Sequence, residues 1–243
     1  MDIQIIYDDE DIIAVNKPAG LSVHPDGKTK QQTLTDWLME KYPEIEKVGE
    51  PLKLSSGKTI HRAGIVHRLD KDTSGVMVVA KNQKTFLSLK KQFQDRDVRK
   101  EYRVIVHGVP KEKKGVIDLP IGRSAKDFRT KSTTPNVRGE MREAATEYSI
   151  LSAGEDFSSL AVLPRTGRTH QIRVHLKSIG HPVVCDKLYA PKRKCPEEMG
   201  RLALHAHMLT IKSHEGVLLH FEAPLPEDFN RMIDTLSRLQ TGV

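Results

Sequence analysis

The sequence contains few cysteines and no long apolar run. Only Cys185 and Cys195 occur among 243 residues, and a chain of this size that avoids cysteine is typical of a reducing compartment. No stretch of about 18 consecutive apolar residues is present, which excludes a membrane-spanning helix. The N-terminus has no basic start followed by an apolar stretch, so a secretory signal is not expected. These absences predict a cytoplasmic protein with no membrane partner.

The sequence also lacks the usual metal-binding spacings. Its 11 histidines include no His-Glu-x-x-His pair, and no Cys-x-x-Cys pair occurs. The best candidate ligands are His175, His181, Cys185 and Cys195, and their spacing matches no zinc pattern. We therefore predict no metal site.

Acidic residues are outnumbered by basic ones. The chain has 39 Lys+Arg against 32 Asp+Glu, which gives a net charge of +7 and an isoelectric point near 9.3. This balance favours a polyanionic partner such as RNA. Arginine in loops suits bidentate contact with phosphate and stacking on bases. The basic residues crowd into four segments: 81–103, 123–142, 165–177 and 187–201.

Hydrophobic periodicity predicts more strand than helix. Residues 3–7 and 12–16 read as a hairpin, and Thr33 begins a helix with apolar residues at helical spacing. Asn82 is placed to cap a helix over 83–95, which follows a buried strand at 75–80. The order favours an α+β fold with a mixed, largely antiparallel central sheet flanked by helices and loops. No linker is evident, so we predict a single domain over 1–243. Further strands are expected at 102–106, 146–151, 160–163, 202–211 and 217–221, hairpins or loops within 110–142, and helices at 169–179 and 227–239.

A dense polar cluster lies between two apolar runs at residues 64–75. Such a loop usually carries function, and the flanking Arg68 and Lys71 would keep the Asp70 carboxylate ionised at neutral pH. An ionised, positioned carboxylate is what covalent catalysis by aspartate requires. A tight turn capped by Asp70 or Asp72 explains the spacing at least as well. Asp72 is the better turn residue, which leaves Asp70 for chemistry.

A second polar cluster covers residues 164–176. Ile172 and Leu176 form an apolar stripe, and Arg173 lies at its edge, where its guanidinium can reach inward to a carboxylate. We predict an inward ion pair for Arg173. For Arg165 and Arg168 we predict contact with phosphate or water.

These clusters and four shorter blocks resemble the RluA-type pseudouridine synthases. The His67–Gly75 block and the His170–His175 block are the most specific, and all blocks occur in the family's order over nearly the whole chain. The resemblance implies the pseudouridine synthase fold, with a central catalytic cleft. The other blocks are Lys17–Gly20, Lys100–Tyr102, Arg201–Ala206 and Phe221–Pro226.

The resemblance also implies roles for individual residues. Asp70 matches the catalytic aspartate, and Arg68 the arginine that fills the gap left by the flipped-out uridine. Tyr102 matches the tyrosine that lies against the uracil and is a candidate for handling the C5 proton. Arg173 matches the basic residue paired with the aspartate. The remaining predicted substrate contacts are His67, which we expect to order the loop, Leu69 as a wall residue, Thr73, Arg165, Arg168 and His170.

The implied reaction needs no cofactor, because uracil detaches from the ribose, rotates and rejoins through C5 without net redox change. The implied partner is a ribosomal or transfer RNA stem-loop, with no obligatory protein partner and a monomeric chain. Many family members carry an N-terminal S4-type RNA-binding domain, whereas this sequence opens at the catalytic-domain hairpin. We therefore expect the catalytic domain itself to recognise RNA.

Two segments depart from the family's pattern where RNA contacts are expected. Cys185 and Ala190 stand where the family often has glycine, and the stretch 129–132 is weaker than usual. Two other functions remain as alternatives. A catalytically silent RNA-binding protein would bind RNA in a salt-dependent way without product. A hydrolase using Asp70 and His67 would release a fragment, although no nucleophile-elbow motif supports it.

Overall fold

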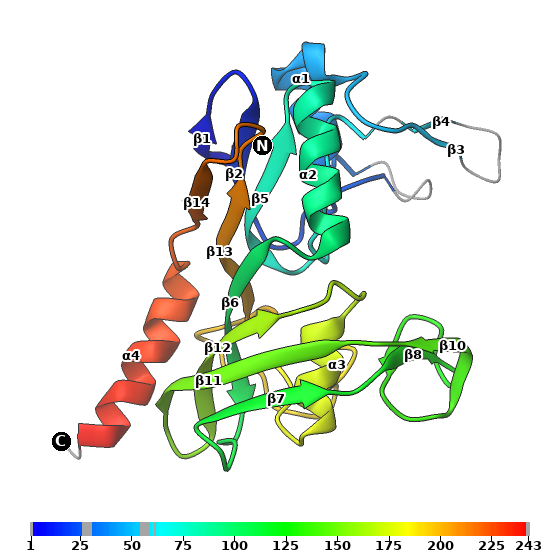
Figure 1. Cartoon of the computed structure of the whole chain (residues 1–243). Coiled ribbons are helices and arrows are strands. Elements are labelled where there is room, and N and C mark those ends of the chain that lie inside the picture. Colours follow the sequence, from blue (N-terminus) through cyan, green and yellow to red (C-terminus); the bar gives the residue numbers. More distant parts are fainter. Residues whose placement is uncertain (1, 26–30, 54–58, 61, 242–243) are drawn as a thin grey trace. The chain divides into compact units, whose positions relative to one another are not determined.

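The computed structural model describes residues 2–25, 31–53, 59–60 and 62–241. The chain folds into two compact units. Unit 1 comprises Met1–Arg99 and Ala206–Ala223, and unit 2 comprises Lys100–His205 and Pro224–Val243. Each unit contains its own strands and two of the α-helices (Figure 1). The single domain over 1–243 stays a prediction.

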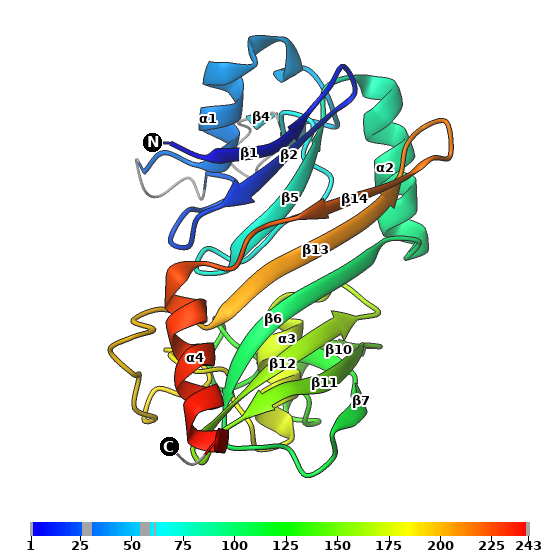
Figure 2. The ribbon, with the colours of Figure 1, turned by 90° about the vertical axis from the view of Figure 1, so that its left-hand side faces the viewer.

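Unit 1 pairs its strands in the order β1-β2-β5-β13, and β14 pairs with β13. The pairings β1–β2, β2–β5 and β13–β14 are antiparallel. Both α-helices of the unit cover the same face of these strands (Figure 2). The elements of unit 1 are β1 (Gln4–Asp8), β2 (Ile12–Lys17), α1 (Leu34–Lys41), the 3-10 helix Pro43–Ile45, β3 (Leu52–Lys53), β4 (Thr59–Ile60), β5 (Ser74–Ala80), α2 (Gln83–Asp95), β13 (Leu204–Lys212, from Ala206 onward in this unit) and β14 (Leu218–Glu222).

Local capping fixes both α-helices of unit 1 at the predicted places. The Thr33 side chain accepts the N–H of Asp36, and the Asp36 carboxylate accepts the N–H of Thr33, which is a capping box. The Asn82 side chain likewise accepts the N–H of Thr85 at 2.9 Å. The predicted hairpin, the strand at 75–80 and the helix over 83–95 are confirmed.

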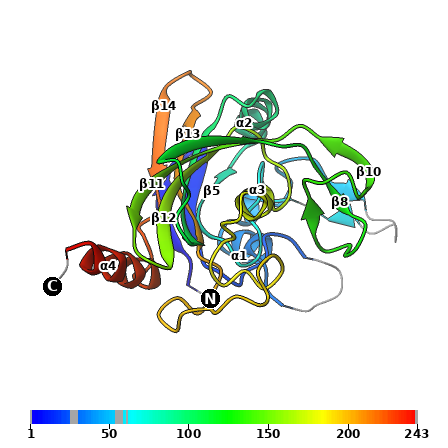
Figure 3. The ribbon, with the colours of Figure 1, turned by 90° about the horizontal axis from the view of Figure 1, so that it is seen from below.

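Unit 2 pairs its longer strands in the antiparallel order β6-β12-β11-β7. Helices α3 and α4 pack on opposite faces of β11 and β12 (Figure 3). Three short strands pair in the order β10-β8-β9. The elements of unit 2 are β6 (Arg99–His107), β7 (Lys114–Asp118), β8 (Ile121–Ser124), β9 (Lys131–Ser132), β10 (Val137–Arg142), β11 (Ala145–Ala153), β12 (Phe157–Pro164), α3 (Gln171–Ser178) and α4 (Glu227–Thr241).

The core of unit 2 lies between β6, β12 and the flanking helices. Val104, Leu160 and Leu176 are fully buried there, together with Phe229 of α4. Burying such side chains stabilises the fold by about 1.5–3 kcal/mol each. The predicted α+β class with a largely antiparallel sheet is confirmed, and the individually predicted strands and helices are present, whereas β3, β4 and the 3-10 helix Pro43–Ile45 were not predicted.

Candidate active site

The ten predicted site residues divide equally between the two units. Unit 1 holds His67, Arg68, Leu69, Asp70 and Thr73, and unit 2 holds Tyr102, Arg165, Arg168, His170 and Arg173.

Asp70 is half-buried in a turn that leads directly into β5. The N–H of Thr73 donates to the Asp70 carbonyl at 3.2 Å and closes the turn. The side chain of Leu69, on one side, is 4% exposed, and that of Thr73, on the other, is 2% exposed. Two buried residues therefore hold the backbone around Asp70, which itself stays partly exposed.

A buried ammonium anchors this turn from β2. The Lys17 Nζ donates to the carbonyls of Pro18 and Leu21, both at 2.9 Å, and of Lys71 at 3.0 Å. Lys17 is completely buried, and a buried charge is tolerated only when hydrogen bonds compensate it. The N–H of Gly20 also donates to the Lys71 carbonyl, at 2.9 Å. The sequence identified residues 17–20 as a block of the family resemblance but did not reveal this role of Lys17.

Gly75 is required by the close approach of β5 to β13. Its φ is +118°, and a Cβ there would lie 2.1 Å from the Ala206 carbonyl oxygen. Any other residue would both clash with the neighbouring backbone and adopt an unfavourable φ. The glycine of the His67–Gly75 block therefore fixes where the Asp70 turn meets the sheet.

His67 orders the segment that precedes Asp70. Its Nε2 accepts the backbone N–H of Val78 at 3.0 Å, and its ring stacks on Phe93 with centroids 4.5 Å apart. Because Nε2 is an acceptor, the ring proton lies on Nδ1 in the neutral tautomer. These contacts fit the predicted loop-ordering role.

Arg68 is exposed, and its neighbourhood is positively charged. Burial, followed by the nearby charges of Arg62 and Arg68, lowers the pKa of His24 to about 4. The Thr35 hydroxyl donates to the Val23 carbonyl at 2.6 Å, so it accepts from His24 Nδ1 at 3.0 Å. His24 is therefore a neutral, oriented imidazole at physiological pH, and the positive charge beside it comes from arginine.

In unit 2, Tyr102 lies on β6 opposite Val162 of β12. Its side chain is half-buried and packs against the core. A tyrosine in this position combines a packed ring with a polar hydroxyl group. The pairing of β6 with β12 and the contact with the core of unit 2 hold the ring.

The loop between β12 and α3 carries three predicted substrate contacts. Arg165 is exposed and its Nε binds Glu147 Oε1 at 2.5 Å, while Arg168 Nε donates to the Glu143 carbonyl at 3.1 Å. His170, with φ +58°, caps α3. The predicted contact of both arginines with phosphate stays a prediction.

A buried polar network fixes α3 and was missed by the sequence reasoning. His175 Nε2 lies 2.9 Å from the Leu119 carbonyl, which only accepts, so Nε2 is the donor. Nδ1 must then accept from the Thr146 hydroxyl, also at 2.9 Å. That hydroxyl in turn accepts from Gln171 Nε2 at 3.0 Å. Burial lowers the pKa of His175, which keeps the network neutral.

Arg173 forms the predicted inward ion pair, and its partner is Asp186. Arg173 Nε donates to Asp186 Oδ2 at 2.7 Å, and Nη2 donates to Oδ1 at 2.8 Å. The two side chains are 7% and 0% exposed. The pairing of Arg173 with Asp70, which the resemblance implied, stays a prediction.

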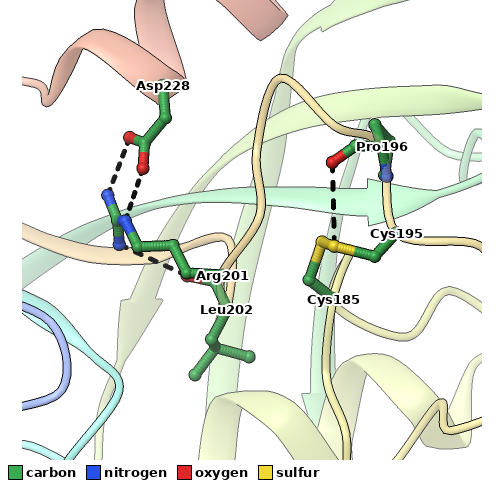
Figure 4. The surroundings of a disulfide bond; sticks show 6 residues. All are labelled: Cys185, Cys195, Pro196, Arg201, Leu202 and Asp228. Carbon is green, nitrogen blue, oxygen red and sulfur yellow. Dashed lines mark hydrogen bonds and ion pairs between the residues drawn. A yellow bond between two sulfur atoms is a disulfide. The ribbon is translucent and has the colours of Figure 1, made fainter.

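Residues 185–195 form a loop that is closed by a disulfide. Cys185 and Cys195 are bonded, with their Cα atoms 4.7 Å apart (Figure 4). Cys185 has φ +59°, in the left-handed region that favours glycine, which is the residue that the family pattern implied for this position. Neither cysteine is a free thiol, so both are unavailable as metal ligands. The scarcity of cysteine therefore does not mean that the chain lacks a disulfide.

In the part of the chain that the structure describes, no group of three or more His, Cys, Asp or Glu side chains is arranged to hold a metal ion. Within the same residues, no helix has the length and apolar character needed to cross a membrane.

Comparisons with known proteins agree with the resemblance. The model of the RNA pseudouridylate synthase family matches residues 11–178. An uncharacterized RNA pseudouridine synthase, YlyB of Bacillus subtilis, is 38% identical over 98% of this chain and 74% of its own length. The ribosomal large subunit pseudouridine synthase D of Haemophilus influenzae is 36% identical over 96% of this chain and 71% of its own length.

A solved structure shares the fold. The human RNA pseudouridylate synthase domain containing 4 superposes with a TM-score of 0.72 at 27% identity, covering 97% of this chain and 92% of its own. Fold and sequence together define an enzyme that modifies RNA. The chain belongs to the RNA pseudouridylate synthase family, and it converts uridine in RNA to pseudouridine.

Proposed function

We propose that this enzyme isomerises specific uridines in structured ribosomal or transfer RNA, with Asp70 as its catalytic carboxylate. The observation that carries the proposal is the anchoring of the Asp70 turn. Lys17 binds the Lys71 carbonyl after Asp70, and His67 binds β5 before it. A carboxylate on a partly exposed residue whose backbone is held on both sides is suited to covalent or general-base chemistry.

The reaction assigns a task to each proposed residue. The bond between C1′ and N1 breaks, a bond between C1′ and C5 forms, and the C5 proton leaves while N1 gains a proton. Asp70 either forms an adduct or assists elimination to a glycal, and Tyr102 handles the C5 proton. Arg173 supplies a fixed positive charge beside the carboxylate.

Base flipping gives Arg68 its role. Extruding a stacked uridine costs a few kcal/mol, which stacking and hydrogen bonding by an inserted side chain offset. Arg68 is exposed and lies two residues before Asp70, so it is placed to fill the vacated position while the base enters the pocket. Leu69 is proposed as a wall of that pocket.

A buried hydroxyl beside Asp70 supports a substrate contact at Thr73. Its Oγ1 is buried and has no hydrogen-bond partner among the described residues. Such orphaned groups are rare in native proteins and usually have a functional reason. We propose that Thr73 Oγ1 gains its partner when the turn closes on the uridine.

The three short strands of unit 2 are proposed as an RNA-binding surface. Six basic and two acidic residues lie between Arg123 and Arg142, and Phe128 is 75% exposed among them. Arg129 lowers the pKa of Asp127 to about 2, so that carboxylate stays charged and holds the arginine. Basic side chains around an exposed ring suit phosphates and an unstacked base. Arg165, Arg168 and His170 are proposed to extend these contacts.

The names of relatives favour ribosomal RNA as the substrate. Three relatives at 36–38% identity are each called ribosomal large subunit pseudouridine synthase D.

We propose that the enzyme acts as a monomer without an obligatory protein partner, in the cytoplasm. The disulfide tests that location, because such bonds are rare in cytosolic proteins outside hyperthermophiles. Thiol alkylation of cell extracts followed by mass spectrometry measures the redox state of the pair.

Mapping pseudouridines in a deletion strain tests the substrate. Ribosomal and transfer RNA are sequenced from cells lacking the gene and from cells complemented with the wild-type or the Asp70→Asn chain. We expect sites in large-subunit RNA that disappear on deletion and return only with the wild type. Sites confined to transfer RNA would replace the ribosomal substrate, and the absence of any lost site would favour a silent RNA-binding protein.

A further inference from the structure

The Asp186 carboxylate is held more fully than an ion pair requires. Besides its two bonds to Arg173, its Oδ1 accepts the backbone N–H groups of Leu188 and Tyr189, both at 3.0 Å. Asp186 is 1% exposed. Four N–H donors therefore fix this carboxylate in place, so it is a rigid support for whatever it binds.

The guanidinium of Arg173 is restrained from a second direction by Tyr189. Its Cζ lies 5.1 Å from the centroid of the Tyr189 ring. The Tyr189 hydroxyl accepts the N–H of Lys131 at 2.7 Å and lies 3.0 Å from His170 Nδ1. The ring is thus fixed by groups on β9 and at the start of α3. Arg173 is held by two hydrogen bonds to Asp186 and by the face of the Tyr189 ring.

This arrangement serves orientation rather than stability. Burying two charges removes them from water, and a buried ion pair contributes little net stability compared with apolar residues. A bidentate fork, in contrast, fixes both the position and the rotation of a guanidinium. The fork uses Nε and Nη2, so Nη1 is the guanidinium nitrogen outside it. The proposed role of Arg173 beside the catalytic carboxylate therefore assigns that contact to Nη1.

We propose that Asp186 is a positioning residue for the isomerisation and acts through Arg173. The inference rests on the proposed function, in which Arg173 supplies the charge beside the catalytic carboxylate. Asp186 touches no reacting atom. Its negative charge and its two oxygens hold the guanidinium in the single orientation that the reaction uses.

Steady-state kinetics of Asp186→Asn test the proposal. The amide keeps the shape but presents an N–H group to one arm of the guanidinium, so the fork is lost. We expect kcat to fall about 100-fold, as for a misplacement of about 1 Å, with KM for RNA unchanged within about threefold. A kcat within about threefold of wild type in a folded protein would overturn the proposal.

The matched control is Asp228→Asn, which breaks a second, partly buried bidentate pair of unit 2. Arg201 Nη2 binds Asp228 Oδ1 at 2.8 Å, and Nε binds Oδ2 at 2.5 Å (Figure 4). Both variants are expected to lower the melting temperature, but only Asp186→Asn lowers kcat when assayed well below both melting points. An equal loss of kcat in the control would assign the effect to unit stability and overturn the proposal.

Two further variants keep the test decisive. Asp186→Glu preserves the charge and shifts the carboxylate by one methylene, so it folds more readily. We expect a kcat reduced at least about tenfold at unchanged KM, and a wild-type kcat overturns the proposal. In a variant that already carries Arg173→Lys, adding Asp186→Asn should lower kcat by no more than about a further threefold. The reason is that the two residues act as one unit.

The two possible failures are distinguishable. If Arg173→Lys leaves kcat unchanged, the proposed function of Arg173 fails, and the inference falls with it. If Arg173→Lys lowers kcat but Asp186→Asn does not, only the positioning role of Asp186 fails.

Discussion

The Lys17 ammonium donates a hydrogen bond to the Lys71 carbonyl at 3.0 Å, although the residues are 54 positions apart. This contact ties the end of β2 to the turn that carries Asp70. The ammonium is completely buried and is satisfied by backbone carbonyls rather than left as an isolated charge. The position of the proposed catalytic turn therefore depends on a residue far from it in sequence.

Lys17→Met should destabilise the protein strongly. The apolar side chain fills a similar volume but removes the ammonium donor from the Pro18 and Leu21 carbonyls and leaves the Lys71 carbonyl with the Gly20 N–H alone, at a cost of about 2–5 kcal/mol in unfolding free energy. Urea denaturation measures the loss. Lys91→Met is the control, because the Lys91 side chain is 78% exposed and should change stability by no more than about 0.5 kcal/mol. Equal effects of the two variants would contradict the anchoring role.

His24 makes stability fall as the pH decreases from 6.5 to about 4. Its folded-state pKa of about 4 is lower than the ordinary 6.5, so in this window the unfolded chain binds a proton that the folded protein does not. The contribution of the lowered His24 pKa to the free energy of unfolding is fully present above pH 6.5. It amounts to about 1–3 kcal/mol.

Urea denaturation across this pH range measures the slope. His24→Gln should flatten it, whereas His220→Gln, at an exposed position, should keep it. An unchanged slope in His24→Gln would show that other groups cause the acid sensitivity.

Much of the local structure was predictable, because its causes are local. The capping box at Thr33, the Asn82 cap and the length of α2 follow from neighbouring residues. The inward orientation of Arg173 also followed from its place beside an apolar stripe. The identity of its partner, Asp186, could not be predicted in this way, because Asp186 lies on a loop whose path depends on long-range packing.

The buried polar groups were the least predictable. His175 and Gln171 appear in the sequence as parts of a motif, but their bonds to Thr146 connect segments far apart in the chain. The bridge between Cys185 and Cys195 was missed because two cysteines ten residues apart do not by themselves reveal whether their Cα atoms approach. The roles of these polar groups and of the two cysteines could be assigned only from the three-dimensional structure.

Removing the disulfide should lower stability moderately. Cys195→Ser opens a loop with a separation of ten residues, which the chain-entropy model values at about 2–3 kcal/mol. A dithiol reductant should lower the melting temperature of the wild type to that of the variant and leave the variant unchanged. A wild type insensitive to the reductant, with mass spectrometry showing reduced thiols, would contradict a stabilising bridge.

Tyr102→Phe should slow turnover after uridine capture. Removing the phenolic hydroxyl takes away the group proposed to handle the C5 proton, so the single-turnover rate should fall about 100-fold or more while RNA affinity holds. Tyr148→Phe, at a partly buried tyrosine on β11, is the matched control. A Tyr102→Phe rate equal to that of the control would remove Tyr102 from proton transfer.

Tritium release from RNA labelled at uracil C5 tests the central claim most directly, because C5 loses its hydrogen when it bonds to the ribose. RNA is drawn from cells lacking the protein and incubated with wild type, Asp70→Asn and Asp72→Asn. Asp72, an exposed carboxylate two positions away, controls for local charge. We predict release by wild type and Asp72→Asn, and less than about one thousandth of it by Asp70→Asn with RNA binding intact. Release by Asp70→Asn near the wild-type rate would contradict Asp70 as the catalytic carboxylate.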